Sequence, residues 1–349
     1  MHQDKTFILS RFITIYSFAH FLVDTACAFL LLGVLEIKDA ILAMLLYNAF
    51  AFVLQAPFGY LIDKYLNPKV VAIIGLILIA TAYIFWDNPL IAISIVSVGN
   101  ALYHVGGGSL VLSLNKRKAT YIGIFVAPGA LGLAIGSLLS FSKLDFYNWL
   151  LPVLLLIICG LIYNIKTPPF KRDIANRLPG SISYSILLIV LIMVPIIVRS
   201  LIGLSVEFPW KENKTLLFVL ISSLALGKVF GGILADKFGL LKVGIGGLVI
   251  SSPLLAFYST IPFLGIFGAF VFNFTMPVTL IAMFNVLPNN KGLSFGLTTV
   301  AMFIGSLPTI LGKNLWLKND FIVLLLVLTS ALVLFAAIRF MIMLKILKS

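Results

Sequence analysis

Long apolar stretches alternate along the chain with short segments that carry charges, prolines and glycines. A helix needs ~20 apolar residues to cross ~30 Å of hydrocarbon, and each stretch is about that long. The pattern predicts twelve membrane-spanning helices, at roughly residues 9–34, 40–62, 69–86, 90–113, 120–141, 147–165, 182–205, 215–235, 240–259, 261–287, 292–312 and 320–344. Little sequence lies between them, so we expect short connections and no separate soluble domain.

The composition supports a protein embedded in a bilayer. Of the residues, 61% are apolar and 11% are charged, whereas soluble domains have ~45–50% apolar and ~25% charged residues. These values exclude a soluble enzyme, a disordered regulator and a secreted disulfide scaffold. Most lysines and arginines fall in loops that would share one side of the membrane, which predicts cytoplasmic termini and a place in the cytoplasmic membrane. The net charge of +13 then needs no nucleic-acid partner.

The longest connection, residues 166–180, lies near the middle of the chain. It contains Pro168, Pro169 and Pro179 together with several basic residues. We therefore predict an N-terminal six-helix bundle at 1–165, a cytoplasmic linker at 166–180 and a C-terminal six-helix bundle at 181–349.

An internal repeat relates the two halves. The segment Phe58–Lys69 (FGYLIDKYLNPK) matches Gly231–Lys242 (GGILADKFGLLK), with an offset of 173 residues that takes Asp63 to Asp236. The same offset takes Asn100 to Asn273. We define the gate motif as Gly59, Asp63 and Lys64 in the first half and Gly232, Asp236 and Lys237 in the second. Duplicated halves with a binding site between them are typical of transporters.

The gate motif resembles the signature G-x-L-a-D-[RK]-x-G-[RK] that the major facilitator superfamily carries between its second and third helices. The first copy differs from it at Leu66 and Asn67, and the second copy keeps Gly239. The resemblance implies an all-α membrane fold, with twelve transmembrane helices in two pseudo-symmetric six-helix bundles. It also implies transport of a small molecule by alternating access, and we expect a monomer.

Two shorter resemblances point to branches of that superfamily. The fosmidomycin-resistance branch has a His followed by an Asp in helix one and a His in helix four, as His20, Asp24 and His104 do here, although Val105 stands where that branch usually has a Pro. Drug/proton antiporters carry a Gly-Pro element in helix five, which Ala127-Pro128-Gly129 matches in part. These resemblances slightly favour export.

The two aspartates of the gate motif are expected at the cytoplasmic edge of the membrane. There, a carboxylate can pair with basic groups or with a helix N-terminus. Such contacts would hold the inner gate closed when the transporter faces outward. The alternative is an ordinary solvated turn.

Polar side chains inside the predicted spans indicate a substrate cavity. A charged side chain at the bilayer centre costs at least ~2.5–3.5 kcal/mol, so it should face a cavity or a partner. His20 and Asp24 are four residues apart and share a helix face with Tyr16. Arg199 could attract an anionic substrate or pair with Glu207. The predicted cavity residues are Tyr16, His20, Asp24, Asn100, His104, Arg199 and Asn273.

We expect Asp24, assisted by His20, to carry the coupling proton, because His and a desolvated Asp can titrate near neutral pH. The alternative is a fixed hydrogen bond that only ties helix one to a neighbour. The predicted function is a proton-coupled secondary transporter, with export slightly favoured over uptake symport of a small organic anion or sugar.

Two further classes remain open: a non-transporting sensor or assembly partner, and an intramembrane enzyme that holds a metal on His20, Asp24 and His104. The sequence has no H-E-x-x-H motif and no P-loop, so we assign no catalytic residue, cofactor or resident metal. The expected partners are a small-molecule substrate, protons and the lipid bilayer.

Overall fold

The computed structural model describes residues 2–34, 40–114, 118–142, 144–172, 182–344 and 346. Every element in these ranges is helical, and twelve helical segments are long and apolar enough to cross a membrane. The predicted all-α membrane fold and its twelve spans are thus confirmed. Residues 173–180 of the predicted linker and Ser181 lie outside the described ranges.

Ten of the spans run without a break, with α4 continued by a 3-10 turn (Tyr83–Phe85) to complete its span, and the other two are interrupted. The continuous ones are α1 (His2–Val34), α4 (Pro68–Ala82), α5 (Pro89–Leu112), α6 (Ala119–Phe141), α7 (Phe146–Asn164), α8 (Ile182–Ser205), α9 (Lys214–Phe238), α10 (Leu240–Phe257), α13 (Lys291–Ile310) and α14 (Asp320–Met343). The second span consists of α2 (Ala40–Asn48), a π-helical turn (Ala49–Val53) and α3 (Gln55–Lys64). The tenth consists of α11 (Pro262–Phe272) and α12 (Thr275–Val286).

The break in the tenth span has a local cause. Pro277 has no N–H to donate to the carbonyl of Asn273, four residues earlier. The side-chain amide of Asn273 donates instead to the Ala269 carbonyl at 2.9 Å, which competes with the regular helix ladder. Asn273 is the C-cap residue that follows the end of α11 at Phe272, whereas its repeat partner Asn100 lies inside the unbroken α5.

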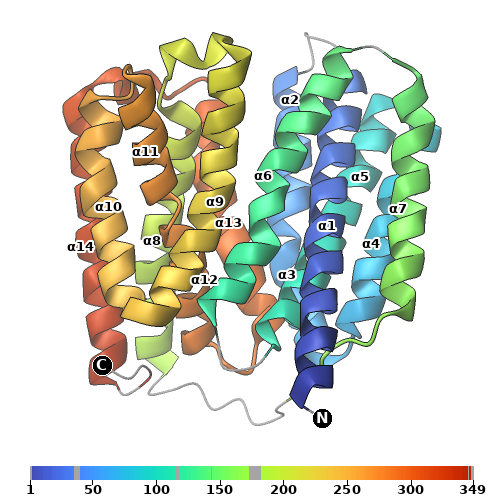
Figure 1. Ribbon diagram of the computed structural model, residues 1–349, viewed down its shortest axis with the longest axis horizontal. Helices are drawn as coiled ribbons and strands as arrows, with labels where there is room; N and C mark the ends of the chain where they lie inside the picture. Colours follow the sequence, from blue (N-terminus) through green and yellow to red (C-terminus); the bar gives the residue numbers. More distant parts are fainter. Residues whose placement is uncertain are drawn as a thin grey trace. The chain divides into compact units, whose positions relative to one another are not determined.

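The helices form two compact units. The first unit contains residues 1–114, 124–172 and 291–296, and the second contains residues 115–123, 173–290 and 297–349. The first turn of α13 thus belongs to the first unit, and the first turn of α6 belongs to the second. In the first unit α1, α4, α5 and α7 run side by side (Figure 1). In the second unit α10 packs against α11 and α14, and α14 packs against α8.

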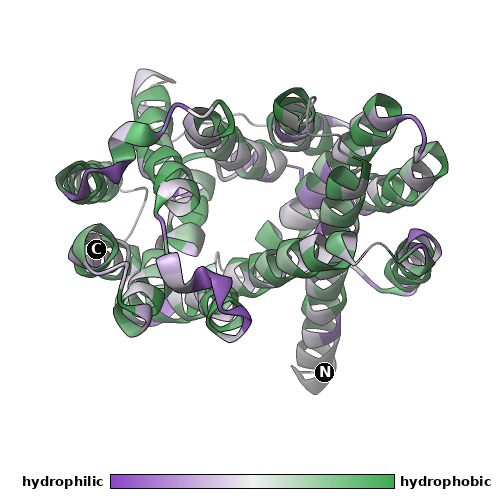
Figure 2. Cartoon of the chain, turned by 90° about the horizontal axis from the view of Figure 1, so that it is seen from above, coloured by the Kyte–Doolittle hydropathy of each residue, from purple (hydrophilic) through white to green (hydrophobic). Residues whose placement is uncertain are grey.

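Apolar side chains face outward from both units, as expected of a protein solvated by lipid. In the first unit the exposed stripe on α7 includes Val153, Leu156 and Ile157, and in the second unit α14 exposes Leu325 and Leu332. Apolar residues dominate the helices in Figure 2. The composition and these exposed stripes together identify a multi-pass membrane protein.

The two copies of the gate motif end their helices in different ways. In the second copy, Gly239 ends α9 with φ +93°, a left-handed conformation that glycine adopts without strain. In the first copy, Leu66 occupies the matching position and α3 ends with a different turn. Asn67 then caps α4 by accepting the Lys69 N–H, and Pro68 starts that helix. The departure from the family signature at Leu66 and Asn67 is thus accommodated by an Asn-Pro helix start.

Helices α4 and α5 of the first unit pack closely against each other through glycines. A Cβ at Gly75 would lie 2.5 Å from the Tyr103 nitrogen and 2.6 Å from the Gly99 oxygen. Both atoms belong to the backbone of α5, so neither can shift aside without moving that helix. Small residues allow this approach between membrane helices.

We predict that Gly75→Ala destabilises the protein by about 1–3 kcal/mol, the usual cost of overpacking a well-packed interior. Gly160→Ala on α7 is the matched control, because a Cβ there meets no atom within 4 Å. Thermal unfolding in detergent provides the measurement. Equal melting temperatures for the two variants would show that α4 and α5 do not pack this closely.

Candidate functional site

Three ionisable side chains meet in the interior of the first unit. His20 and Asp24 come from α1, and His104 comes from α5; all three are buried, with at most 9% of each residue exposed. The Nε2 atoms of the two histidines lie 2.9 Å apart. Asp24 Oδ2 lies 3.2 Å from His20 Nε2, and Asp24 Oδ1 lies 3.4 Å from His104 Nε2. We call these three residues the His–Asp cluster.

Helix geometry and one backbone hydrogen bond position the cluster. His20 and Asp24 are four residues apart on α1, so they project from the same face. His104 Nδ1 lies 2.9 Å from the carbonyl oxygen of Asn100, one turn earlier on α5. Since a carbonyl oxygen only accepts, Nδ1 carries the hydrogen of a neutral ring, and Nε2 presents a lone pair to the cluster.

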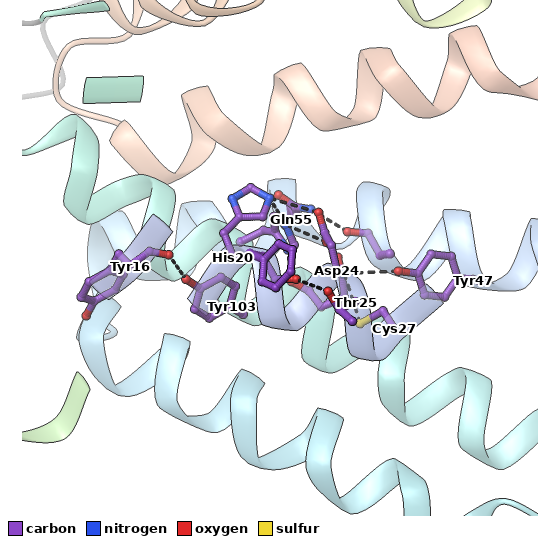
Figure 3. Close-up of polar contacts among 12 residues, drawn as sticks. Tyr16, His20, Asp24, Thr25, Cys27, Tyr47, Gln55 and Tyr103 are labelled. Atoms are coloured by element: carbon purple, nitrogen blue, oxygen red, sulfur yellow. Dashed lines mark hydrogen bonds and ion pairs between the residues drawn. The ribbon is translucent and has the colours of Figure 1, made fainter. Parts of the chain in front are cut away.

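The side chain of Asn100 points away from the cluster. It donates to the Tyr47 hydroxyl at 3.2 Å and approaches the Cys27 sulfur at 3.4 Å. These residues lie beyond Asp24 in the close-up (Figure 3). Asn100 therefore contributes its carbonyl oxygen to the cluster and its amide to a neighbouring polar group.

Tyr16 lies one turn before His20 on α1. Its carbonyl oxygen accepts a hydrogen bond from the Tyr103 hydroxyl at 2.6 Å, as Figure 3 shows. The Tyr16 hydroxyl is buried and has no hydrogen-bond partner within the described part of the chain. The backbone of Tyr16 thus ties α1 to α5, while its hydroxyl makes no bond to the His–Asp cluster.

Gly129 of α6 closes one side of the cluster. A Cβ at this position would lie 2.4 Å from Asp24 Oδ2 and 2.5 Å from His20 Nε2. Gly132 and Gly136 approach the α1 backbone in the same way, at the carbonyl oxygens of Phe21 and Thr25. The sequence shows this glycine spacing, but which helix the glycines face is visible only in the structure. Tyr47, Cys27 and Phe125, whose ring centroid lies 4.8 Å from that of His20, are further neighbours that sequence reasoning missed.

Arg199 and Asn273 belong to the second unit. The Arg199 Nε atom is buried and has no hydrogen-bond partner in the described ranges. The considered pairing of Arg199 with Glu207 is not found; instead, Glu207 lies 3.8 Å from Lys318 Nζ, and both of those side chains are exposed. The Asn273 amide bonds to its own helix.

Each gate-motif aspartate accepts hydrogen bonds from the N-terminus of a helix. In the first unit, Asp63 accepts the N–H groups of Gly292 and Leu293 at 2.9 Å each, at the start of α13. In the second unit, Asp236 accepts the N–H groups of Ala119 and Thr120 at 2.8 and 3.1 Å, at the start of α6, and also the Thr120 hydroxyl. We call these contacts the Asp63 latch and the Asp236 latch.

The two latches are the same contact with partners exchanged between the repeats. The offset of 173 residues takes Asp63 to Asp236, and it also takes Ala119 to Gly292 and Thr120 to Leu293. The glycine four residues before each aspartate makes the approach possible. A Cβ at Gly59 would lie 2.2 Å from the Gly292 oxygen, and a Cβ at Gly232 would lie 2.6 Å from the Ala119 oxygen.

Two lysines of the repeated segments, Lys237 and Lys69, make other contacts. Lys237 Nζ lies over the Phe238 ring, 5.2 Å from its centroid. At the end of the first copy, Lys69 donates to the carbonyl oxygens of Tyr163 and Ile165, where α7 ends, which is a favourable place for a cation. Among the partners that the sequence left open, helix N-termini are the ones that the structure places at both aspartates.

Comparison with known proteins gives a consistent assignment. The family model described as Major Facilitator Superfamily matches residues 8–310. No curated protein matches the sequence significantly. Among solved structures, the Escherichia coli fucose:proton symporter FucP aligns with a TM-score of 0.69 and 15% identity, covering 94% of this chain and 98% of that chain.

Two other solved structures align over similar lengths. The human organic anion transporter TETRAN gives a TM-score of 0.69 at 15% identity, covering 95% of this chain and 99% of its own. The nucleoside transporter NupG gives 0.57 at 14% identity, covering 95% and 98%. At these identities the structural likeness shows the fold alone. The family match over most of the sequence shows that this chain belongs to the major facilitator superfamily and is a membrane transporter.

Proposed function

We propose that the protein is a proton-coupled secondary transporter that moves a small molecule across the cytoplasmic membrane by alternating access, with export as the favoured direction. The exchanged latches carry this proposal. A carboxylate at a helix N-terminus is a reversible contact, worth about 0.3–2 kcal/mol. Two such contacts, related by the repeat, suit a gate that opens and closes many times rather than a permanently fixed joint.

The proposal places both latches and both termini on the cytoplasmic side, because basic residues concentrate in the loops that flank them. In this arrangement the latches hold the inner gate closed while the substrate site is open to the outside. When the inner gate opens, the helix N-termini of α6 and α13 leave Asp236 and Asp63. We expect the protein to work as a monomer, since one chain contains both repeats.

Asp24 is the proposed proton carrier, and His20 assists it. A carboxylate inside a membrane span is costly unless its charge is balanced, and cycling between charged and neutral forms gives it a use in transport. The titratable groups around Asp24 are His20 on α1 and His104 and Tyr103 on α5, with Cys27 and Tyr47 nearby. From α6, the backbone of Gly129 packs against the cluster.

We propose that Tyr16, Asn100, Arg199 and Asn273 line the substrate cavity together with the His–Asp cluster. Arg199 also supports the alternative of uptake symport for a small organic anion, since its buried Nε atom has no partner in the described ranges. Intramembrane ionisable groups mark substrate or ion pathways. Flux measured in proteoliposomes separates both transport directions from a sensor or assembly role without flux.

The latches generate the first prediction of this proposal. Asp63→Asn and Asp236→Asn each remove a negative charge from a helix N-terminus and should weaken the closed inner gate by about 0.3–2 kcal/mol. Transport should slow several-fold while the melting temperature stays close to that of the wild type. The double variant should deviate from the product of the single effects, because the two latches act in one transition.

Asp145→Asn is the matched control, since Asp145 is an exposed acid in a loop. Transport by this variant should equal that of the wild type. Wild-type rates in both latch variants and in the double variant would remove the gating role.

The proton carrier generates the second prediction. Asp24→Asn mimics the neutral carboxyl group permanently, so transport driven by a pH gradient should be lost. The measurement is substrate-dependent proton movement, followed with a pH-sensitive dye inside proteoliposomes. His20→Ala should shift the pH dependence of transport if His20 tunes Asp24. Asp87→Asn, an exposed acid between α4 and α5, provides the control. Full gradient-driven transport with a normal pH profile in Asp24→Asn would make Asp24 a packing residue.

A further inference from the structure

The His–Asp cluster brings several atoms that can bind a cation close together. Four acceptor-capable atoms converge there: the two histidine Nε2 atoms and the two carboxylate oxygens of Asp24. The hydrogen of a neutral His104 is on Nδ1, where it bonds the Asn100 carbonyl oxygen. A hydrogen on His20 Nε2 would face both His104 Nε2 and Asp24 Oδ2.

This arrangement favours a bound cation. His104 Nε2 and Asp24 Oδ1 lie 3.4 Å apart, so a lone pair on the neutral ring would face the negative oxygen. In a buried site this repulsion is poorly screened. A positive ion among the three side chains removes it and also balances the charge of the carboxylate.

The distances within the cluster suit one metal ion. Zinc and similar ions bind imidazole nitrogen and carboxylate oxygen at about 2.0–2.2 Å, in tetrahedral or octahedral geometry. Two such ligand atoms on the same ion lie roughly 2.8–3.6 Å apart, for angles between 90° and 109°. The three separations in the cluster are 2.9, 3.2 and 3.4 Å. The 3.2 and 3.4 Å separations involve different oxygens of Asp24; ligand atoms taken one from each residue all lie within 4.8 Å of one another.

The donor set indicates the class of metal. Two imidazoles and one carboxylate suit divalent ions of the first transition row, such as Zn²⁺, Co²⁺ or Mn²⁺, and leave coordination positions open. Mg²⁺ and Ca²⁺ prefer oxygen ligands throughout. The hydrogen bond from His104 Nδ1 to the Asn100 carbonyl is the outer contact that metal-binding histidines usually have, and it points Nε2 at the ion.

His20 has a weaker outer contact, which bears on the role of the site. When His20 Nε2 binds an ion, the ring hydrogen moves to Nδ1, which is buried without a hydrogen-bond partner in the described part of the chain. An unsatisfied buried donor reduces the net gain from binding. A site on a transport path must release its ion as well as capture it. His104 has an outer hydrogen bond on Nδ1 and His20 has none among the described residues, so the site is better suited to a transported ion than to a permanent structural ion.

We propose that His20, Asp24 and His104 bind a divalent first-row transition-metal ion, and that this ion is the cargo of the transporter. The inference rests on the proposed function, because it names the substrate of that same site. It differs from the considered metalloenzyme, in which the ion stays in place and takes part in a reaction. In the present case the ion enters and leaves through the alternating-access cycle.

Direct binding to the purified full-length protein tests this inference without any transport assay. The probe is Co²⁺ added to metal-free, untagged protein in detergent, followed by its visible absorption and by calorimetry. We expect one Co²⁺ per chain, competition by Zn²⁺ and no competition by Mg²⁺. Zn²⁺ should also raise the melting temperature of the wild type.

Variants show whether the bound ion is in the cluster. His20→Gln, His104→Gln and Asp24→Asn preserve side-chain size and should each weaken Co²⁺ binding at least about tenfold, the scale of loss caused by removing even an outer-shell partner. The control is His2→Ala, which removes the remaining histidine of the sequence and should leave binding unchanged. Gel filtration and melting temperature without metal identify any variant that fails to fold.

A second variant keeps the test decisive if the substitutions on α1 or α5 misfold. Gly129→Ala places a methyl group against Asp24 Oδ2 and His20 Nε2, and it should lower Co²⁺ affinity without changing any ligand. No binding by the wild type, or binding that survives all cluster variants, would overturn the inference.

The binding experiment separates this inference from the proposed function. If the wild type binds no Co²⁺ yet moves protons in response to another substrate, proton-coupled transport stands and the metal cargo is wrong. If Co²⁺ binds at the cluster and proteoliposomes also take up Co²⁺, detected with a trapped metal-sensitive dye, both stand. If Co²⁺ binds at the cluster but proteoliposomes show no flux of Co²⁺ or protons, the cargo role and the proposed transport are both wrong.

Discussion

The absence of water in the bilayer core is the constraint on which this structure depends. Every buried polar group there must find its partner inside the protein. The first unit meets this demand by bringing His20, Asp24 and His104 together between α1 and α5. The helix N-termini of α6 and α13, with their unsatisfied N–H groups, meet it by donating to Asp236 and Asp63. Both polar groupings that carry the functional argument therefore also provide hydrogen-bond or ionic partners for polar groups of the helices.

The internal repeat gives these contacts their organisation. Each latch needs an aspartate, a glycine one turn earlier and a helix start from the other half of the sequence. Because the sequence is duplicated, each half contains an aspartate, a glycine and a helix start. The aspartate of each half binds the helix start of the other half, so the two contacts are equivalent. The cluster has no such duplicate: the positions that match His20, Asp24 and His104 in the second half are Met193, Ile197 and Pro277. The latch contacts are thus present in both repeats, whereas the His–Asp cluster belongs to one of them.

Much of the fold follows from hydropathy, because the length of an apolar run sets a span directly. The family follows from the repeated Asp63 and Asp236 segments. The π-helical turn at Ala49–Val53 and the break at Asn273 did not follow from apolar length. The break depends on a side-chain bond and a proline, which leave the apolar length unchanged. In the site, spacing on one helix predicts that His20 and Asp24 share a face. The meeting of His20 with His104, 84 residues later, depends on how α1 packs against α5, and so does the turn of the Asn100 amide toward Cys27.

The central claim is that the two latches open and close in one transition, and hydrogen exchange at the latched amides tests it most directly. The amides of Gly292 and Leu293 report on the Asp63 latch, and those of Ala119 and Thr120 report on the Asp236 latch. The measurement is the exchange rate of both pairs, by mass spectrometry, in the wild type and in Asp63→Asn. A coupled gate predicts faster exchange at all four amides in the variant, including the two that Asp63 does not touch. Faster exchange confined to Gly292 and Leu293 would contradict it.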